Sequence, residues 1–260
     1  MNDPSIVAII PARYGSTRLP AKPLVDLRGK PMIRRVVEQV KKSELVGRVI
    51  VATDDERIAS VVRSFGCEVA MTSPALRTGS DRIAAVAKDL KGAELIVNVQ
   101  GDEPLIQPEM IDEAVRPLQE DESILMGTVV KKISTAEELK SPNCVKAVLD
   151  LDGNAVYFSR SPIPFARETA QIDDWHRKHR YYKHFGLYVY RRQFLLEFSS
   201  WPPSTLETAE QLEQLRVIEH GYRIRAVVTA HDSVPIDTAE DAERVRAILS
   251  RTVPEGAHNG

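Results

Sequence analysis

The strongest constraint on the fold is an alternation of short apolar runs with amphipathic segments in the first 99 residues. Apolar runs lie at 5–10, 48–53, 67–71 and 94–99, and the segments between them have helical periodicity. The first of these segments carries an apolar stripe on one helical face, formed by Met32, Ile33, Val36, Val37 and Val40. Continuous apolar strands between helices are typical of a parallel sheet covered on both faces. The sequence therefore predicts an α/β fold with a mostly parallel central sheet.

The pattern changes after about residue 124. Longer apolar runs such as 123–133 and 184–190 predict strands of a mixed, more antiparallel arrangement. A polar, aromatic and proline-containing stretch separates the run at 154–159 from the one at 184–190. We therefore expect a smaller excursion at about 155–190 that covers a site or builds a subunit contact. A chain of 260 residues can bury one substantial core, and we expect a single domain over 1–260 that includes this excursion.

The C-terminal third predicts two further helices around a strand. One helix is expected over 206–221, where Gly221 ends it, and a strand over 222–230. The last helix is expected to be capped by Thr238, with Asp241 three residues further on. These elements extend the α/β pattern to the end of the chain.

The composition excludes several classes of protein. Apolar residues make up 43% and charged residues 28% of the chain, which is ordinary for a globular protein. The net charge of −2 gives no overall positive field for nucleic acid or for an anionic membrane. No apolar run approaches membrane-spanning length and no secretory leader is evident, so we expect a cytoplasmic protein. Cys67 and Cys144 lack metal-ligand spacing and are expected to be small buried residues.

A basic, proline-rich loop follows the first apolar run, in the stretch "IIPARYGSTRLPAKPL" (9–24). Neither standard phosphate motif is present, because there is no GxxxxGK[ST] and no GxGxxG. What remains is a loop with fixed cations, stiffened by prolines and placed at the carboxyl end of a strand: Arg13, Arg18, Lys22, Pro11, Pro20 and Pro23. Such a loop suits a polyphosphate, and the alternative is a solvated loop whose cations pair with acids.

Two aspartates at expected strand ends are candidate metal ligands. Asp102 follows the run "LIVNVQG" directly, which places its carboxylate at the ligand edge of a central strand. Asp237 lies just before the last predicted helix, where a capping role is the alternative. Magnesium is usually held by one or two carboxylates together with substrate phosphates, so the two residues together suit Mg²⁺.

Eight blocks in order, "IIPARYGSTRLPAKPL", "GKPMI", "VATDDERI", "VNVQGDEPLI", "VYFSR", "HFGLYVY", "LEQLR" and "IDTAEDAERVR", closely resemble the 3-deoxy-manno-octulosonate (Kdo) cytidylyltransferases. The resemblance runs from about residue 5 to 250. It implies a Rossmann-like nucleotidyltransferase core, a homodimer, and transfer of CMP from CTP to the anomeric hydroxyl of Kdo, with release of pyrophosphate, for lipopolysaccharide biosynthesis. Mg²⁺ is the implied cofactor, and CTP and Kdo are the implied substrates.

The resemblance also implies roles for individual residues. Catalysis and charge stabilisation would involve Arg13, Lys22, Asp102 and Asp237, of which the two aspartates would hold the metal. Residues matching the family's nucleotide contacts are Pro11, Ala12, Arg13, Ser16, Arg18, Lys22, Ser80 and Gln100. Residues matching its sugar contacts are Arg160, for the carboxylate of Kdo, and His184, Tyr188, Glu213 and Gln214, for its hydroxyls.

Two departures from the family pattern lie near the expected sugar side. Val234 and Pro235 replace a glycine-rich approach to Asp237, and Thr208 and Ala209 stand where histidine and a larger apolar residue are expected. The acceptor could therefore be a related acid sugar, 8-amino-Kdo or sialic acid. A nucleotide-binding protein without catalysis is the alternative from another class, and retention of both aspartates and of the loop lysine argues against it.

Overall fold

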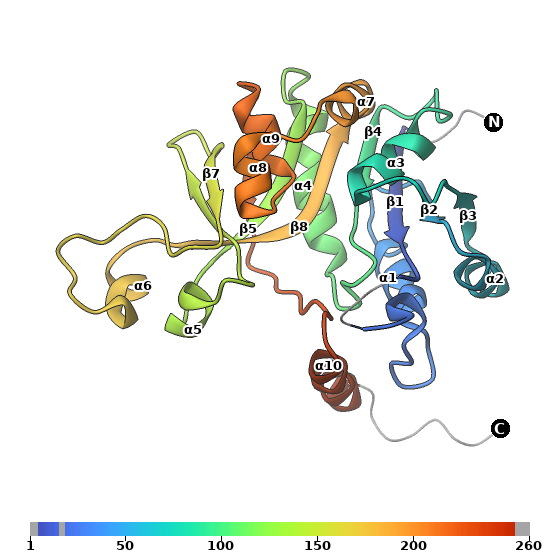
Figure 1. The fold of residues 1–260 in the computed structure, drawn as a ribbon, viewed down its shortest axis with the longest axis horizontal. Helices are drawn as coiled ribbons and strands as arrows, with labels where there is room; N and C mark the ends of the chain where they lie inside the picture. Colours follow the sequence, from blue (N-terminus) through green and yellow to red (C-terminus); the bar gives the residue numbers. More distant parts are fainter. Residues whose placement is uncertain (1–4, 16–18, 253–260) are drawn as a thin grey trace.

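A computed structural model describes residues 5–15 and 19–252, and its strands form one nine-stranded sheet (Figure 1). Along the main path the strands follow the order β3-β2-β1-β4-β8-β5-β9. The first four strands in the chain are mutually parallel: β1 (Ile6–Ala12), β2 (Arg48–Thr53), β3 (Glu68–Met71) and β4 (Leu95–Asn98). The helices that connect them are α1 (Met32–Val40), α2 (Glu56–Ser64) and α3 (Gly79–Ala87).

The second half of the chain extends the same sheet with mostly antiparallel pairs. The long strand β8 (Tyr182–Arg191) runs antiparallel to β4 and to β5 (Met126–Lys132). The last strand, β9 (Arg225–Val228), is parallel to β5 and forms the far edge. The predicted α/β fold, with a parallel core and a mixed addition, is confirmed.

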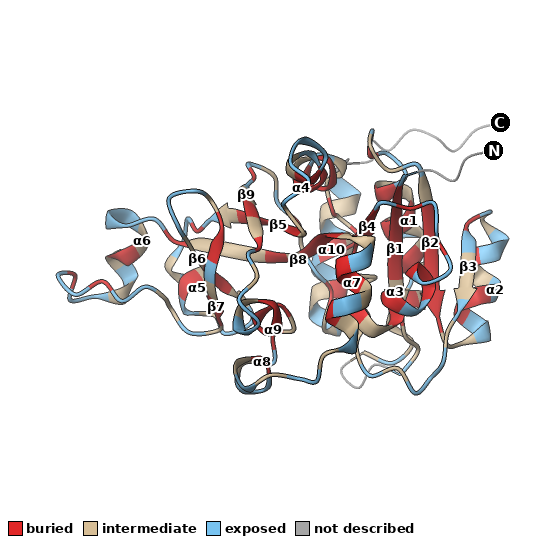
Figure 2. Ribbon diagram, turned by 90° about the horizontal axis from the view of Figure 1, so that it is seen from above, coloured by how far each residue is buried: buried red, intermediate tan, exposed pale blue. Residues whose placement is uncertain are grey.

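Helices cover both faces of the sheet, which explains why its strands are apolar on both sides. Alternate residues of β1 enter different cores: Ile6, Ala8 and Ile10 pack on one face, Val7 and Ile9 on the other. The first face is covered by α1, α2 and α4 (Pro108–Glu120), and the second by α3, α7 (Arg192–Ser200) and α9 (Gln214–Glu219). Figure 2 shows the buried central strands between these helices.

A projection extends from the end of β8 that is remote from β3 (Figure 1). It consists of the hairpin β6 (Lys146–Leu149) and β7 (Ala155–Ser159), together with α5 (Ala136–Lys140), η2 (Ile172–Asp174) and α6 (Trp175–Lys178). A small apolar cluster of its own stabilises it, formed by Ile133, Leu139, Ala166, Trp175 and Tyr181. The excursion predicted at about 155–190 lies in this projection as far as the start of β8, whereas the rest of β8 belongs to the central sheet between β4 and β5.

The predicted helix over 206–221 is wrong in one respect, because two short helices occupy this stretch. α8 (Thr205–Glu210) ends at Gln211, whose φ of 55° is left-handed and cannot continue a helix. The chain then turns into α9, and a buried ion pair joins the two helices, with Arg216 Nε 2.6 Å from Glu207 Oε2. The break between the two helices faces the pocket described below, because Glu213, in the turn between α8 and α9, lines that pocket.

The remaining expectations concern the last helix and the cysteines. α10 (Ala239–Thr252) begins after Thr238, whose hydroxyl accepts from Asp241 N while the Asp241 carboxylate accepts from Thr238 N, so the predicted cap is confirmed. Cys67 is buried as expected, but Cys144 is only partly buried. None of the described helices combines the length and apolar character needed to cross a bilayer.

Candidate active site

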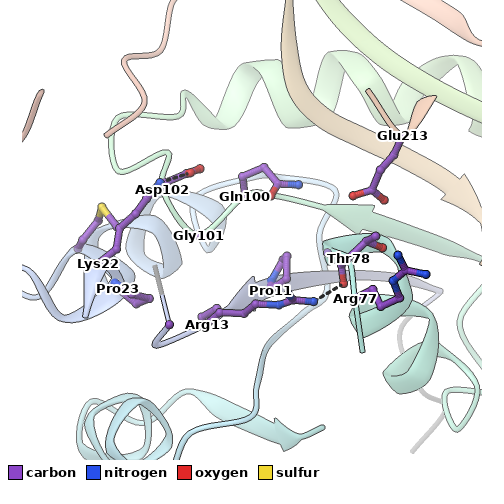
Figure 3. Close-up of a pocket in the computed structure, with 14 residues that line it drawn as sticks. Pro11, Arg13, Lys22, Pro23, Arg77, Thr78, Gln100, Gly101, Asp102 and Glu213 are labelled. Carbon is purple, nitrogen blue, oxygen red and sulfur yellow. Dashed lines mark hydrogen bonds and ion pairs between the residues drawn. The ribbon is translucent and has the colours of Figure 1, made fainter. Parts of the chain in front are cut away.

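A cavity of about 390 Å³ opens where β1 and β4 end, at their carboxyl ends (Figure 3). This is the edge of a parallel sheet at which ligands gather, because the connecting loops diverge there. The cavity is lined by Pro11, Ala12, Arg13, Gly15, Lys22, Pro23, Met32, Arg77, Thr78, Gly79, Gln100, Gly101, Asp102 and Glu213. The loops after β1 and β4 therefore meet as predicted. The loop after β2, residues 53–56, does not line the cavity: Asp54 pairs with the buried Arg82, and Asp55 caps α2.

Lys22 joins the two predicted metal aspartates. It is the first residue of a short helix, η1 (Lys22–Leu24), and its Nζ lies 2.6 Å from Asp102 Oδ2 and 2.8 Å from Asp237 Oδ1. Burial lowers the pKa of Lys22, but the two carboxylates outweigh it and the pKa is raised. Lys22 and Asp102 line the cavity, and Asp237, which does not, joins them through its ion pair with Lys22. The three residues thus lie together, as the family resemblance implied.

The capping alternative for Asp237 is not what the structure shows. The N-terminus of α10 is capped by Thr238 and Asp241, and the Asp241 carboxylate also accepts from the backbone N–H of Asp237. The carboxylate of Asp237 is instead directed to Lys22. Asp237 therefore takes part in the ion pair with Lys22 and not in the cap of α10.

Arg13 is held along the cavity wall by backbone. Its Nη2 donates to the carbonyl oxygens of Leu76 and, at 3.2 Å, Thr78, so it fixes the loop before α3 against the end of β1. Burial, with Arg82 nearby, lowers the pKa of Arg13. Ser16 and Arg18, also predicted for the nucleotide, lie outside the described residues.

Glycines allow close approaches around Gln100, which lines the cavity. A Cβ on Gly101 would lie 2.8 Å from the carbonyl oxygen of Pro11, so only glycine lets these two strand ends meet. A Cβ on Gly186 would lie 3.2 Å from Gln100 Cγ, so β8 presents bare backbone to this side chain. The amide of Gln100 donates to Asn98 Oδ1 at 3.2 Å, and no charged group is needed to hold it. An amide and backbone groups suit an uncharged base.

Ser80 lies beneath the cavity and does not line it. It is buried at the start of α3, and its hydroxyl acts to lower the pKa values of Glu213 and Tyr190, against the larger effect of burial. Glu213 does line the cavity, and burial raises the pKa of its carboxyl although Ser80 and Thr78 hydrogen-bond to it. One of its oxygens, Oε2, is buried with no hydrogen-bond partner among the described residues. Ser80 therefore positions Glu213, which faces the cavity.

His184, Tyr188 and Gln214 are on the same side of the sheet but behind the cavity wall. His184 and Tyr188 alternate with Gly186 along β8, and their rings lie 5.3 Å apart. Burial lowers the pKa of His184 to about 3, and its Nε2 lies 3.0 Å from Thr128 Oγ1, so the ring is neutral. Gln214 is 3% exposed, and its Nε2 has no partner within the described chain.

Arg160 is the predicted site residue that lies most clearly apart from the cavity lining. It follows β7 in the projection, and its guanidinium donates to the carbonyl oxygens of Glu210 (2.9 Å) and Pro142 (3.0 Å). It thus ties the projection to the end of α8. To bind a carboxylate, Arg160 would have to share the guanidinium N–H groups that now donate to these backbone carbonyl oxygens.

Sequence reasoning missed part of the wall, formed by Arg77, Thr78 and Gly79. Thr78 caps α3 in a reciprocal box with Asp81, so the N-terminus of this helix opens on the cavity and favours an anion. The signal was present in "RTGSDR", which is a capping sequence with a glycine at the first helical position. Only Ser80 of this block was selected, and it is buried, as Arg82 is.

Glu103 is a second residue that sequence reasoning passed over. It is 7% exposed, next to Asp102, and its carboxylate accepts a hydrogen bond from the Ser233 hydroxyl. Burial, with the nearby charge of Asp102, raises the pKa of Glu103 to about 8. A neutral carboxyl is therefore buried directly behind the aspartate pair.

Magnesium fits the donor set that the structure presents. Asp102 and Asp237 are both close enough to one cation, Lys22 Nζ, to accept from it, and both remain about a third exposed, at 30% and 37%. Two carboxylates open to solvent suit a hard cation that takes its other ligands from water and phosphate. No cluster of three or more potential metal ligands occurs among residues 5–15 and 19–252, so the protein alone offers no closed metal cage there.

The fold and this site define a nucleotidyltransferase: a doubly covered sheet, a basic loop after the first strand and paired aspartates beside a lysine. A family model described as cytidylyltransferase matches residues 7–224. The chain belongs to the 3-deoxy-manno-octulosonate cytidylyltransferase family. A relative of that name from Geobacter sulfurreducens is 55% identical over 245 residues, covering 93% of this chain and 98% of the relative.

Two further relatives agree. A 3-deoxy-manno-octulosonate cytidylyltransferase from Geotalea uraniireducens is 54% identical over 255 residues, covering 95% of this chain and 99% of the relative. A solved structure of CMP:2-keto-3-deoxy-manno-octonic acid synthetase complexed with CTP matches with a TM-score of 0.88 at 40% identity, covering 95% of this chain and 99% of that chain. The family predicted from the sequence is confirmed.

Proposed function

We propose that the protein transfers CMP from CTP to the anomeric hydroxyl of Kdo and releases pyrophosphate. The observation that carries this proposal is Lys22 held between Asp102 and Asp237 at one end of a cavity of about 390 Å³. That arrangement suits a triphosphate and its metal at one end, while Gln100 and the end of β1 suit an uncharged base. Family membership supports both substrates.

The reaction needs positioning and charge stabilisation more than covalent chemistry. The oxygen of the anomeric hydroxyl forms a bond to the α-phosphorus, and the bond from that phosphorus to the oxygen leading to the β-phosphate breaks. Pyrophosphate leaves with the electron pair of that bond, and the hydroxyl proton passes to solvent. Lys22 and Arg13 would bind the phosphates and offset the negative charge that builds up on them.

Mg²⁺ is the proposed cofactor, and Asp102 and Asp237 would hold it. When bound, it would supply charge neutralisation on the phosphate oxygens and favour ionisation of the attacking hydroxyl. Lys22 Nζ pairs with both of these carboxylates. It would therefore have to move toward the phosphates when the metal binds the same two carboxylates.

For the acceptor, we propose that Glu213 hydrogen-bonds sugar hydroxyls from the cavity wall. Gln214, His184 and Tyr188 would complete that side from behind, and Arg160 would bind the sugar carboxylate after releasing its backbone partners. Since the free Nε2 of Gln214 is a buried donor with no described partner, a hydroxyl oxygen would satisfy it.

The test is pyrophosphate release from the purified protein with CTP and Mg²⁺. Kdo, 8-amino-Kdo and sialic acid are supplied in parallel reactions, and release that depends on Kdo is expected. Asp237→Asn should abolish most of it, whereas Asp232→Asn, five residues earlier and bound to Lys131 and Lys183, should not. Release only with another acid would overturn the acceptor, and no release with any acid would favour nucleotide binding without catalysis.

We also propose a cytoplasmic homodimer. CTP is a cytoplasmic nucleotide, which supports that location for the enzyme. The projection exposes large apolar side chains that a second copy could cover: Phe165 (76% exposed), Val156 (52%) and Leu151 (106%). Sedimentation equilibrium should give twice the chain mass of 29.1 kDa, and a single-chain mass would contradict the dimer.

A further inference from the structure

The segment between β9 and α10 carries Asp237 without belonging to a helix or strand. Residues 229–237 cross the sheet edge as an extended chain, and contacts to three other elements hold them. Thr229 N donates to Val130 O at 2.9 Å, and the Asp232 carboxylate accepts from Lys131 and Lys183. These contacts fix the start of the segment on β5 and β8, but they lie several residues from Asp237.

Nearer the site, two hydrogen bonds close a small ring between this segment and the loop after β4. The Ser233 hydroxyl donates to Glu103 Oε2, and Ile236 N donates to the carbonyl oxygen of Asp102 at 2.9 Å. The ring runs from Asp102 to Glu103, across to Ser233, along Val234 and Pro235 to Ile236, and back. Pro235 has a fixed φ, so the ring has few ways to change shape.

The ring is buried, so its side-chain bond cannot be replaced by water. Ser233 is 6% exposed, Glu103 7%, and Ile236 is fully buried against Leu27 and Met32. A carboxyl group in such a place is unfavourable unless a hydrogen bond satisfies it, and an apolar side chain would fill the same space without that penalty. A buried carboxyl group at Glu103 is understandable if its hydrogen bond has a function. The two candidate metal ligands are the neighbouring residues in the chain: Asp102 precedes Glu103, and Asp237 follows Ile236.

We propose that Ser233 and Glu103 are positioning residues, whose hydrogen bond sets the spacing between the Asp102 and Asp237 carboxylates and thereby the affinity of that pair for a divalent cation. The inference rests on the proposed function, because it takes the two aspartates as metal ligands. Neither Ser233 nor Glu103 lines the cavity, so their effect is transmitted through the two aspartates.

The expected change in metal affinity can be taken from other metal sites, where residues that orient the metal ligands have been removed. Removing a group that orients a metal ligand typically weakens metal binding about 10–100-fold. Here the backbone bond from Ile236 N to Asp102 O remains when the side-chain bond is lost, so we expect the lower end, about tenfold.

The experiment measures Mn²⁺ binding to full-length protein with CTP and without an acceptor sugar, as the loss of the free-ion electron paramagnetic resonance signal beyond the loss that the same concentration of CTP causes without protein. Ser233→Ala is expected to raise the dissociation constant for Mn²⁺ about tenfold. The matched control is Ser43→Ala, because Ser43 makes a buried bond of the same kind to Asp112 Oδ1, at 2.5 Å, away from the cavity. It should lower the melting temperature without changing the Mn²⁺ constant.

A second variant, Glu103→Gln, keeps an acceptor oxygen within reach of the Ser233 hydroxyl. Its dissociation constant for Mn²⁺ should stay within about threefold of the wild type, below the range of about 10–100-fold that loss of an outer partner gives. Unchanged Mn²⁺ binding in Ser233→Ala would overturn the proposal, as would an equal loss in Ser43→Ala. Wild-type protein that binds no Mn²⁺ with CTP would instead overturn the metal assignment, and wild-type protein that binds Mn²⁺ but releases no pyrophosphate with any acid sugar would overturn the proposed function alone.

Discussion

Replacing Lys22 with methionine tests the ion triad at its centre. The ammonium makes two charge-assisted hydrogen bonds, at 2.6 and 2.8 Å, and its side chain is only 14% exposed. Breaking a fully buried pair costs about 3–5 kcal/mol, whereas an exposed pair contributes about 0–1 kcal/mol. Because both carboxylates are about a third exposed, at 30% and 37%, water would compensate much of the loss. Lys22→Met should therefore lower the free energy of unfolding of the ligand-free protein by about 1–2 kcal/mol.

The same change should affect turnover much more than stability. Removing one group that stabilises charge developing in the transition state typically lowers kcat about 10²–10³-fold. Metal ions should then act differently on the two proteins. In Lys22→Met the carboxylates of Asp102 and Asp237 repel each other with no cation between them, so Mg²⁺ alone should raise its melting temperature more than that of the wild type.

The assay combines thermal denaturation with and without Mg²⁺ and steady-state pyrophosphate release. Lys30→Met is the matched control, because Lys30 Nζ pairs with Glu38 at 2.7 Å on the surface, where the two side chains are 39% and 36% exposed. It should change stability by less than about 1 kcal/mol and leave turnover unchanged. Wild-type turnover in Lys22→Met, or an equal response of both proteins to Mg²⁺, would refute the reasoning.

Three more predictions follow from the site. Asp237→Asn should lower kcat at saturating Mg²⁺ by about 10²-fold or more, with an unchanged circular dichroism spectrum. Gly186→Ala should raise the KM for CTP more than that for the sugar acid, because its Cβ would lie 3.2 Å from Gln100 Cγ and displace that side chain. His184 has its pKa lowered by burial from 6.5 to about 3, so the unfolded chain takes up a proton first as the pH falls. The contribution of His184 to the unfolding free energy should therefore fall by about 1.4 kcal/mol per pH unit between about 6.5 and 3. When urea unfolding is compared at pH 7.5 and about 5, the wild type should lose more stability than His184→Gln by that amount per unit.

The strands and the first helices could be predicted because each has a local signal. β1, β2 and β4 are short apolar runs with polar residues at both ends, and α1 follows Pro31 with a complete apolar stripe. All apolar members of that stripe are buried. Once four strands alternate with helices, the parallel order and the common edge follow from the handedness and shortness of the connections.

Other elements gave weaker signals or contrary ones. α4 was not predicted, and it carries a proline, Pro117, inside its last turns. The break between α8 and α9 depends on the left-handed conformation of Gln211, a residue type that gives no sequence signal for it. The Arg216–Glu207 ion pair stabilises that break, and it forms only when the two helices fold back on each other. Such tertiary contacts override local preference.

For the site residues, the topology determines at which edge or face of the sheet each one lies, and the packing determines whether it lines the cavity. Lys22 and Asp102 could be placed at one sheet edge from the sequence, because the loop of each follows an apolar run. Asp237 could be added only through the family resemblance, since its position before a helix by itself favoured a capping role. His184 and Tyr188 could also be assigned to one face, since they alternate along β8. Whether a residue on that face lines the cavity depends on depth, which alternation does not give.

How far a side chain lies from the cavity depends in turn on the space that neighbouring side chains leave. On β8 only the glycine between His184 and Tyr188 leaves room for Gln100, and the two rings on either side pack behind the wall. Ser80 is buried for a similar reason, because the cap of α3 turns Thr78 and Gly79 toward the cavity and the next residue toward Glu213. On this side of the sheet Glu213 therefore lines the cavity, while His184, Tyr188 and Gln214 do not. The Gly186→Ala variant tests this arrangement, because its added Cβ would displace Gln100 and should change the KM for CTP more than that for the sugar acid.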